Sequence, residues 1–396
     1  MLNGEATVRP RGGLRIGIIA AEPSADLLAA GLMDALRERL PQVHFEGIAG
    51  PLMQRSGIDT WAKMESLSVM GLFEVLRHLP RLLALRARVL ARWRDTPPAA
   101  FIGVDAPDFN LTVEMRLRER GVATVHYVSP TVWAWRSGRV RKMRRAIDLL
   151  LAIFPFEPDF LRDRGMSSTY VGHPLARVMP LDPDRGAACA ALGLDPSRRV
   201  LAVLPGSRRG EVARIAPPFL RTAAQLQREL PGLQVVLPLV NDTTRAMVDA
   251  LRMQVTPELD CIVSVGTAHS ALAAADVVLV ASGTATLESL LSKRPMVVGY
   301  RVSAATWIVG RLFRLLKVEH VAMANLLAGE RLAPELLQQA CTPERLLPEL
   351  RALFADPDRR ARIARRYREI HDAMRIDTNH AAAQAVIRLL EQRGLV

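Results

Sequence analysis

The sequence predicts an α/β protein made of two doubly wound, Rossmann-like domains that face a cleft. Short apolar runs typical of buried parallel strands alternate with helical patterns along most of the chain. The 396-residue length and the 49% apolar composition suit two hydrophobic cores better than one. A stretch rich in Pro, Asp and Arg at 179–199 reads as an inter-domain connection. We expect domains at 1–180 and 181–345, with helices over 346–396 that pack back toward the first domain.

The first domain is predicted from six apolar runs separated by helical patterns. The expected strands are 14–21, 45–50, 100–105, 123–130, 149–155 and 168–174. Helical stretches lie between several of them, as at 26–40 and 109–121. Such alternation predicts a parallel sheet with helices on both faces.

The second domain repeats the pattern after the connection. The expected strands are 200–206, 233–240, 261–266, 276–282 and 295–301. The chain ends in helical segments, the last over 379–394.

Composition limits the class of protein. The net charge of +13 favours partners that are nucleic acid, anionic lipid or phosphorylated ligands, and charge alone does not separate them. The three cysteines are far apart, which favours a reducing compartment and indicates neither a disulfide framework nor a zinc site. No apolar run reaches the roughly 18 residues of a membrane span. We read the first apolar run as a strand and expect a cytoplasmic protein.

Two turns of the second half have the composition of phosphate-binding turns. Gly206-Ser207-Arg208 and Ser282-Gly283-Thr284 each lie between an apolar run and a helical pattern. Backbone N–H groups and the positive end of a helix dipole favour a phosphate there, and an Arg fork can bind two oxygens. Ordinary helix capping by Ser and Thr accounts for one such turn equally well, but two in one domain favour a diphosphate site.

Three carboxylates complete the candidate site. Glu288 follows Thr284 by four residues, so it shares a helix face and could accept hydrogen bonds from two ribose hydroxyls; the alternative is a solvated helix residue. Asp105 ends an apolar run, where a carboxylate can accept a proton from a hydroxyl, and Glu22 holds the matching position after the first run. Asp108 is expected to cap the next helix. Turn residues without chemistry remain the alternative for Asp105 and Asp108.

Two histidines fit structural roles better than catalytic ones. His126 and His173 are expected to be buried and satisfied rather than catalytic.

Three basic segments have two interpretations. The segments at 77–95, 136–146 and 306–317 could lie on an anionic membrane or could be helices with one solvated basic face. Nucleic acid is not expected as a partner, because no recognised binding motif or regular aromatic interleaving occurs.

The motifs together resemble bacterial lipid-A-disaccharide synthases, which are glycosyltransferases of the GT-B type. The resemblance runs over most of the chain and rests on segments that occur in order. They are EPSAD (22–26), GIAGPLM (47–53), SVMGLFEVL (68–76), GVDAPDFN (103–110), HYVSPTVWAWR (126–136), FPFE (154–157), YVGHPLA (170–176), LPGSRRGEV (204–212), PLVN (238–241), ASGTATLE (281–288), PMVVGYR (295–301) and NLLAG (325–329).

The resemblance implies condensation of UDP-2,3-diacylglucosamine with 2,3-diacylglucosamine 1-phosphate (lipid X), with inversion and release of UDP. It implies no metal and no cofactor, a peripheral position on the cytoplasmic face of the inner membrane, and allows a homodimer. The UDP-sugar side would comprise Gly206, Ser207, Arg208, Ser282, Gly283, Thr284, Glu288 and Asn325. Asp105 matches the family's proposed catalytic aspartate, with Glu22 beside it holding the acceptor sugar or supporting Asp105.

The chain departs from the family's usual pattern at three positions. Ala21 and Ala25 replace glycines in the first turn, which implies that neither position requires a positive φ, and Ala324 stands where proline is common. Two other functions stay open at this point. A UDP-N-acetylglucosamine epimerase would share the two-domain plan, and a basic nucleic-acid-binding protein would explain the charge but not the paired turns.

Overall fold

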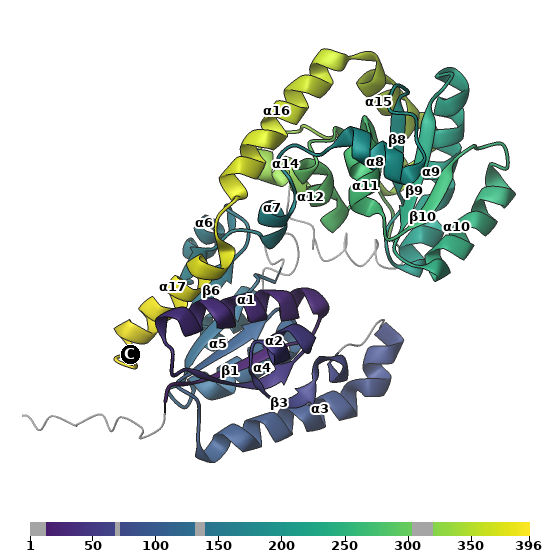
Figure 1. Cartoon of the computed structure of the whole chain (residues 1–396). Helices are drawn as coiled ribbons and strands as arrows, with labels where there is room; N and C mark the ends of the chain where they lie inside the picture. The colour runs from purple at the N-terminus through teal and green to yellow at the C-terminus, as the bar shows by residue number, and fades with distance from the viewer. Residues whose placement is uncertain (1–12, 68–71, 131–138, 303–319) are drawn as a thin grey trace, which may run out of the picture. The chain divides into compact units, whose positions relative to one another are not determined.

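The computed structural model divides the chain into two compact units. It describes residues 13–67, 72–130, 139–302 and 320–396, and for residues 72–78 the backbone only. The first unit comprises Met1–Pro174 and Ile376–Val396, and the second comprises Leu175–Arg375 (Figure 1). The chain therefore passes into the second unit after Pro174 and returns to the first for its last helix.

The first unit is built on a seven-stranded parallel sheet with the strand order β3-β2-β1-β4-β5-β6-β7. Its strands are β1 (Arg15–Ala20), β2 (His44–Ala49), β3 (Asp59–Lys63), β4 (Ala100–Val104), β5 (Ala123–Tyr127), β6 (Leu149–Ala152) and β7 (Ser168–Tyr170). The central strands β4 and β5 are buried along their whole length, as expected for strands covered on both faces.

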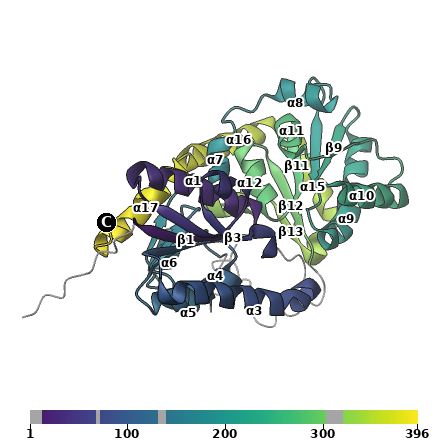
Figure 2. The ribbon, with the colours of Figure 1, turned by 60° about the horizontal axis from the view of Figure 1, so that its bottom comes forward.

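Helices cover both faces of this sheet. They are α1 (Pro23–Arg39), α2 (Pro51–Arg55), α3 (Leu72–Asp95), α4 (Pro107–Arg118), α5 (Arg139–Ala146), α6 (Glu157–Arg162) and the last helix α17 (Thr378–Gln392), with a 3-10 turn over Met64–Ser66. Helix α1 packs against α2 and α17, and α4 packs against α3 and α5 (Figure 2). Proline begins α1, α2 and α4, where a missing N–H costs nothing.

The side chains of β1 alternate between the two faces of the sheet, and each face has its own hydrophobic cluster. Ile16, Ile18 and Ala20 belong to the cluster formed with α1 and α17. Ile19 instead belongs to the cluster that contains the fully buried Trp93 of α3. Successive side chains of a strand point to opposite faces of the sheet, so each face must be covered by its own helices to bury them.

The second unit has a six-stranded parallel sheet with the order β10-β9-β8-β11-β12-β13. Its strands are β8 (Val200–Leu204), β9 (Gln234–Leu239), β10 (Ile262–Val265), β11 (Val277–Ala281), β12 (Met296–Tyr300) and β13 (Glu335–Leu337). Its helices are α7 (Pro174–Val178), α8 (Arg185–Leu192), α9 (Arg209–Glu229), α10 (Asp242–Val255), α11 (Ala268–Ala274), α12 (Thr284–Leu291), α14 (Met323–Ala328), α15 (Pro343–Ala355) and α16 (Pro357–Met374), with a 3-10 turn over Gln338–Ala340.

Each sheet reverses its strand order once near its middle. In the first unit, β1 lies between β2 and β4, and in the second, β8 lies between β9 and β11. Ligands of open α/β sheets bind beyond the carboxyl ends of the strands at such reversals. The sequence after β1 and β4 contains Glu22 and Asp105, and the two predicted phosphate turns follow β8 and β11.

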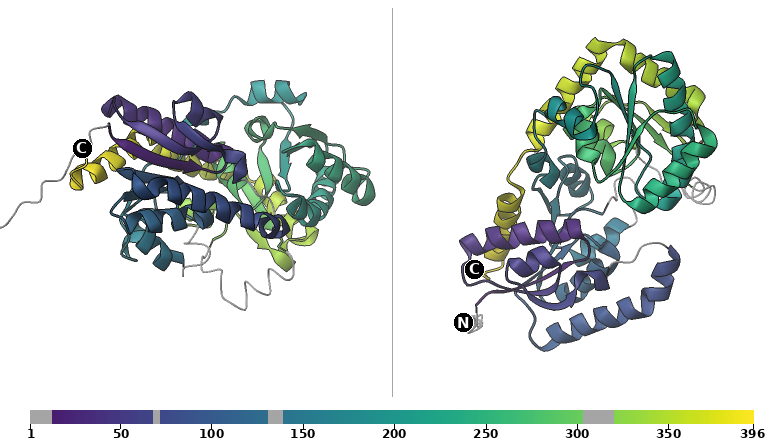
Figure 3. Two further views of the ribbon diagram at one scale, coloured as in Figure 1. Left: turned by 90° about the horizontal axis from the view of Figure 1, so that it is seen from below. Right: turned by 45° about the vertical axis from the view of Figure 1, so that its right-hand side comes forward.

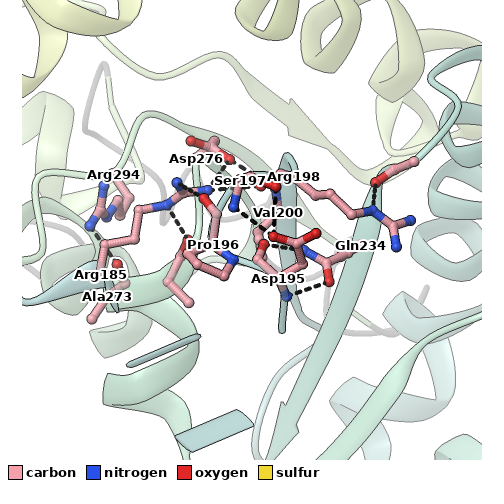
Figure 4. A network of polar contacts seen from close by, with 12 residues as sticks. Arg185, Asp195, Pro196, Ser197, Arg198, Val200, Gln234, Ala273, Asp276 and Arg294 are labelled. Atoms are coloured by element: carbon pink, nitrogen blue, oxygen red, sulfur yellow. Dashed lines mark hydrogen bonds and ion pairs between the residues drawn. The ribbon is translucent and has the colours of Figure 1, made fainter. Parts of the chain in front are cut away.

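The segment expected to connect the domains is built into the second unit. Arg185 at the start of α8 donates to Asp276 at 3.0 Å and to the main-chain oxygens of Pro196 and Arg198 (Figure 4). Asp276 in turn accepts the N–H of Val200 at 2.8 Å. These bonds fasten 185–200 to the amino ends of β8 and β11, so this stretch is part of the second unit rather than a free linker.

The last three helices divide between the units. Helix α15 packs on α9, and α16 packs on α12 and α14, so both belong to the second unit. Helix α17 packs along α1, and Figure 3 shows it as the yellow helix beside the purple one. Gly31 of α1 allows this approach, because a Cβ there would lie 2.5 Å from the Asn379 side chain.

Candidate functional site

A cavity of about 580 Å³ lies at the carboxyl ends of β8, β9 and β11 in the second unit. The predicted site residues that line it are Gly206, Ser207, Arg208, Ser282, Gly283, Thr284 and Glu288. Pro238, Leu239 and Val240 supply part of an apolar wall. The structure therefore brings together seven of the eight residues that the sequence assigned to the UDP-sugar side.

The turn between β8 and α9 forms one side of this cavity. Gly206 has a φ of 113°, a conformation that favours glycine, and Arg208 stands immediately before the first residue of α9. Ser207 and Arg208 are exposed, so both are available to a ligand. The Glu211 carboxylate accepts the N–H of Ser207 at 3.3 Å and holds the turn from the helix side.

The turn between β11 and α12 forms the second side. Gly283 has φ 139° and ψ −158°, a combination almost restricted to glycine, and the space where a Cβ would lie is open. Buried Thr286 anchors the turn, because its hydroxyl donates to Gly283 O at 2.7 Å and accepts the N–H of Met323 at 3.1 Å. The exposed Thr284 is the first residue of α12.

Two helix amino ends and one arginine border the cavity, together with the carboxylates of Glu211 and Glu288. The amino ends of α9 and α12 point their free N–H groups and dipoles toward it, and Arg208 adds a full charge. Such an arrangement stabilises an anion with several oxygens, as a diphosphate has.

Glu288 and His269 form a pair in the same cavity. The Glu288 carboxylate lies 3.8 Å from His269 Nε2. Burial raises the pKa of Glu288, and the neighbouring imidazole acts in the opposite direction. His269 was not among the residues predicted from the sequence, although it follows the turn after β10, the same position relative to a strand that singled out the other turns.

Asn325 occupies a different place from the one expected. It is fully buried in α14 and is absent from the residues that line the cavity. Its amide donates to Ala333 O and to Glu335, both at 2.8 Å, and its carbonyl accepts the N–H groups of Leu332 and Ala333. The side chain therefore organises the chain after α14. Ala324 beside it is also fully buried.

The first unit carries the other predicted residues at the carboxyl edge of its sheet. Ala20 of β1 lies opposite Val104 of β4 in the parallel register, so Glu22 and Asp105 both follow just beyond that pair. Asp105 has a φ of 53°, the next residue Ala106 has 44°, and the N–H of Asp105 donates to Tyr127 O at 2.8 Å. Consecutive left-handed residues that are not glycine are uncommon and concentrate at functional sites.

The first turn of the chain is held by Asp26. Neither Ala21 nor Ala25 has a positive φ, which confirms that these positions do not require glycine. Glu22 is exposed immediately before α1, whereas Asp26 is buried and accepts three N–H groups, those of Gly50, Leu52 and Met53. The EPSAD segment therefore contains one exposed carboxylate and one structural one.

One prediction for this edge is wrong. The expected burial of two histidines is confirmed, although Nε2 of His126 has no hydrogen-bond partner among the described residues. Asp108 does not cap α4: Ala106 precedes the helix, and the Asp108 side chain is 87% exposed and pairs with Arg139 at 2.7 Å. The left-handed turn moves the helix start toward Pro107, which leaves Asp108 inside the first turn. His126 is fully buried and contacts Glu114, and His173 is buried beside the Phe154 ring. Burial lowers the pKa of His173 to about 4.

The basic segments lie partly on described helices. In α3 the buried side chains Leu85, Val89 and Trp93 face the core, while Leu79 and Leu83 are exposed on another face. Helix α5 exposes four cations on one side: Arg141, Lys142, Arg144 and Arg145. Segment 306–317, residues 136–138 and most of the HYVSPTVWAWR motif lie outside the described residues. None of the described helices is long and apolar enough to cross a membrane.

Solved structures with the same arrangement are known. The chain resembles a UDP-GlcNAc 2-epimerase from Neisseria meningitidis bound to UDP-GlcNAc, with a TM-score of 0.61, 9% identity, and coverage of 96% of this chain and 99% of that one. It also resembles CalG4, the calicheamicin glycosyltransferase, with a TM-score of 0.57, 16% identity, and coverage of 96% and 99%. At such identities the similarity establishes the fold, which is the GT-B arrangement of two parallel-sheet α/β domains.

Sequence relatives specify the family. The chain is 48% identical to a lipid-A-disaccharide synthase of Pseudomonas aeruginosa, over 96% of this chain and 99% of the relative. It is 45% identical to one of Pectobacterium carotovorum, with coverage of 96% and 99%. The family model described as lipid-A-disaccharide synthetase matches residues 16–389. The chain therefore belongs to the lipid-A-disaccharide synthetase family, and it is a glycosyltransferase of lipid A biosynthesis.

Proposed function

We propose that this enzyme condenses UDP-2,3-diacylglucosamine with 2,3-diacylglucosamine 1-phosphate (lipid X). The 6-hydroxyl oxygen of lipid X forms a bond to the anomeric carbon of the donor, and the bond from that carbon to the diphosphate oxygen of UDP breaks. The products are a β-1,6-linked disaccharide 1-phosphate and UDP. The observation that carries the proposal is the cavity of the second unit, where two helix amino ends and Arg208 converge in a chain of this family.

The donor's UDP is assigned to that cavity. The diphosphate would lie at the amino ends of α9 and α12, beside the Gly206-Ser207 and Gly283-Thr284 turns, with Arg208 on its oxygens. Glu288 would accept from the ribose hydroxyls, with His269 beside it. As the glycosidic bond breaks, negative charge grows on the UDP oxygen, and donors already aimed at that position stabilise it without reorganisation.

The acceptor's proton is assigned to Asp105. Inversion requires one displacement and one base, and a carboxylate at the end of β4 can accept the proton of the attacking hydroxyl. The left-handed backbone at Asp105 and Ala106 supports this assignment, because strained conformations persist where the surrounding fold fixes a side chain for a task. Glu22 at the same sheet edge is assigned to the acceptor sugar or to support of Asp105.

Both proposed substrates carry acyl chains, so we assign the enzyme to the cytoplasmic face of the inner membrane. Helix α3 supports this assignment: Leu79 and Leu83 are 41% and 45% exposed, and Arg81 and Arg88 are exposed on the same helix. Exposed apolar side chains and exposed cations on one helix are both features of helices that bind an anionic bilayer surface. A homodimer is a further expectation, which sedimentation at several protein concentrations would test.

The test is a reaction with purified enzyme, UDP-2,3-diacylglucosamine and lipid X. We expect equal amounts of disaccharide 1-phosphate and UDP by mass spectrometry, and a β linkage by NMR. Asp105→Ala should reduce kcat by about 10²- to 10⁴-fold, which is the usual contribution of a general base. Asp95→Ala is the matched control, because that carboxylate is 86% exposed at the end of α3. Near-normal turnover by Asp105→Ala would remove Asp105 as the base.

The same assay distinguishes the epimerase alternative. An epimerase converts a UDP-sugar into its epimer without forming a disaccharide. Epimerised UDP-sugar with no disaccharide from the purified enzyme would therefore contradict the proposed function.

A further inference from the structure

We propose that Asn110 is the positioning residue that holds Asp105 in its left-handed conformation, backed by the buried pair Glu114 and His126. The inference rests on the proposed role of Asp105 as the base. Asn110 belongs to the GVDAPDFN segment, but no part of the proposed function uses it.

Asn110 reaches the turn from inside the core. Its side chain is fully buried on α4, and Nδ2 lies 2.8 Å from the main-chain oxygen of Asp105. The same nitrogen lies 3.5 Å from the oxygens of Val104 and Ile19, so it spans the ends of β4 and β1. A left-handed residue directs its carbonyl away from the sheet ladder, and Asn110 supplies a hydrogen bond to that carbonyl.

A close approach between helix and strand makes this hydrogen bond possible. Gly103 of β4 faces α4, and a Cβ there would lie 2.3 Å from Glu114 Oε1 and 2.8 Å from Asn110 Cβ. Glycine at this position lets α4 lie close enough for a short amide to reach Asp105.

Glu114 and His126 hold α4 in that place. Glu114 follows Asn110 by one helical turn, and its Oε1 lies 2.6 Å from Nδ1 of His126 on β5, with both side chains fully buried. Burial raises the pKa of Glu114, and His126 acts against that rise. His126 lies opposite Gly103 in the register, and the next residue, Tyr127, accepts the N–H of Asp105. The Glu114–His126 pair thus connects α4 to β5, and it lies beside Gly103 of β4, the strand that leads into the Asp105 turn.

The left-handed turn itself explains why support is needed. Residues other than glycine are destabilised in this region, because their Cβ approaches the neighbouring carbonyl oxygen. Asp105 and Ala106 adopt it in succession, and Val128 at the end of β5 adopts it as well. Buried hydrogen bonds that exist only in this conformation can offset that cost.

Asn110→Ala tests the inference directly. We expect kcat to fall about 10- to 100-fold, the range that follows from misplacing a reacting group by a fraction of an ångström to one ångström. KM for both substrates and the Kd for UDP should stay within about twofold, because the hydrogen bond is made to Asp105 rather than to substrate. Thr112→Ala is the matched control, since Thr112 lies on the same helix and its hydroxyl accepts a long hydrogen bond from Lys142, at 3.4 Å.

Two further variants distinguish positioning from general stability. In an Asp105→Ala background, Asn110→Ala should cause no further loss of kcat, because its effect passes through Asp105. Ala106→Gly should restore part of the activity of Asn110→Ala, because glycine adopts a left-handed φ without the penalty. All variants are compared well below their melting temperatures, and Asn110→Ser replaces Asn110→Ala if the latter does not fold.

Each result bears on one proposal or on both. A folded Asn110→Ala with unchanged kcat, beside an inactive Asp105→Ala, would overturn the positioning role alone. An additive loss in the Asp105→Ala background would also overturn it. Near-normal turnover by Asp105→Ala would overturn both the positioning role and the assignment of the base.

Discussion

The carboxylate of Asp26 accepts the N–H of Gly50 at 3.1 Å, which joins the turn after β1 to the turn after β2. The same carboxylate accepts the N–H groups of Leu52 at 2.9 Å and Met53 at 3.1 Å, so it caps the short helix α2 from outside. Asp26 is therefore the structural residue of the first turn, whereas Glu22 is exposed.

Replacing Asp26 should destabilise the first unit. Asp26→Ala leaves three N–H groups without their acceptor, which should lower the free energy of unfolding by about 2–4 kcal/mol. Thermal unfolding measures the change, and Asp34→Ala, an exposed carboxylate on the same helix, is the control. The Kd for UDP should not change, since that cavity belongs to the second unit. A wild-type melting temperature for Asp26→Ala would contradict the structural role of this carboxylate.

Arg208 and Arg209 should behave differently although they are neighbours. Arg208 lines the cavity, and Arg209 is exposed but is absent from its lining. Arg208→Ala should weaken UDP binding by about 10- to 100-fold, as expected for loss of a charge-assisted contact to phosphate. Arg209→Ala should bind UDP within about twofold of the wild type. Calorimetric titration with UDP measures the affinity of both variants. Equal losses of affinity in the two variants would indicate only a general effect of positive charge.

Glu288→Gln should bind UDP less tightly and yet unfold at a higher temperature near neutral pH. Burial raises the pKa of Glu288 above its ordinary value of 4.5. A group with a raised pKa contributes stability below its ordinary pKa and loses it as pH rises through the folded value. The ionised side chain therefore destabilises the ligand-free fold at neutral pH, and glutamine removes that cost.

The pH dependence makes this prediction specific. The stability gain of Glu288→Gln should be present at pH 8 and vanish by about pH 4, where the wild-type carboxyl is protonated. The affinity for UDP should fall about tenfold, through loss of a charged acceptor for the ribose. Glu258→Gln, an exposed carboxylate of the same unit, serves as control. A gain that persists at pH 4 would assign the effect to packing instead.

Charge reversal on α3 should reduce membrane binding. Arg81→Glu together with Arg88→Glu should weaken binding to vesicles that contain phosphatidylglycerol by at least about tenfold, since each surface cation contributes about 1 kcal/mol. Arg86 is left unchanged, because its guanidinium lies 3.4 Å from Asp108 O and 6.0 Å from the Phe109 ring centroid. Arg362→Glu with Arg365→Glu on α16 changes the net charge equally and should bind nearly as the wild type. Equal losses in both double variants would indicate non-specific attraction.

Several features could be predicted from local sequence because their causes are local. The alternation of apolar runs with helical patterns predicts two parallel α/β sheets, which the structure confirms. The Gly206 and Gly283 turns were identifiable because glycine and small polar residues between a strand and a helix are typical of turns that bind anions. The family resemblance, carried by many ordered segments, is confirmed by the match over 16–389.

Other features depend on contacts between residues far apart in the chain. Asn325 follows a helix start like many ligand-binding residues, but its partners at 332–335 turn it into a buried scaffold residue. The sequence around Asp108 resembles that of a helix cap, but the left-handed turn at Ala106 places the start of α4 at Pro107, before Asp108. His269 follows a strand-to-helix turn like the other two, but only the fold shows that α11 brings its ring within 3.8 Å of Glu288.

By itself, the sequence determined the fold class, the family and the turns that line the cavity. The periodicity of apolar residues and the need for glycine in a turn both depend on residues that are close together in the sequence. Only the tertiary structure decided which polar side chains line the cavity and which are buried within the fold. Asp26, Asn110, Glu114 and Asn325 are all polar residues near site motifs, yet each is buried and hydrogen-bonded to a segment distant from its own motif or to the turn it supports. Burial favours such roles, because a buried polar group is stabilised by a hydrogen-bond partner, although Asn110 Oδ1 and Glu114 Oε2 have none among the described residues.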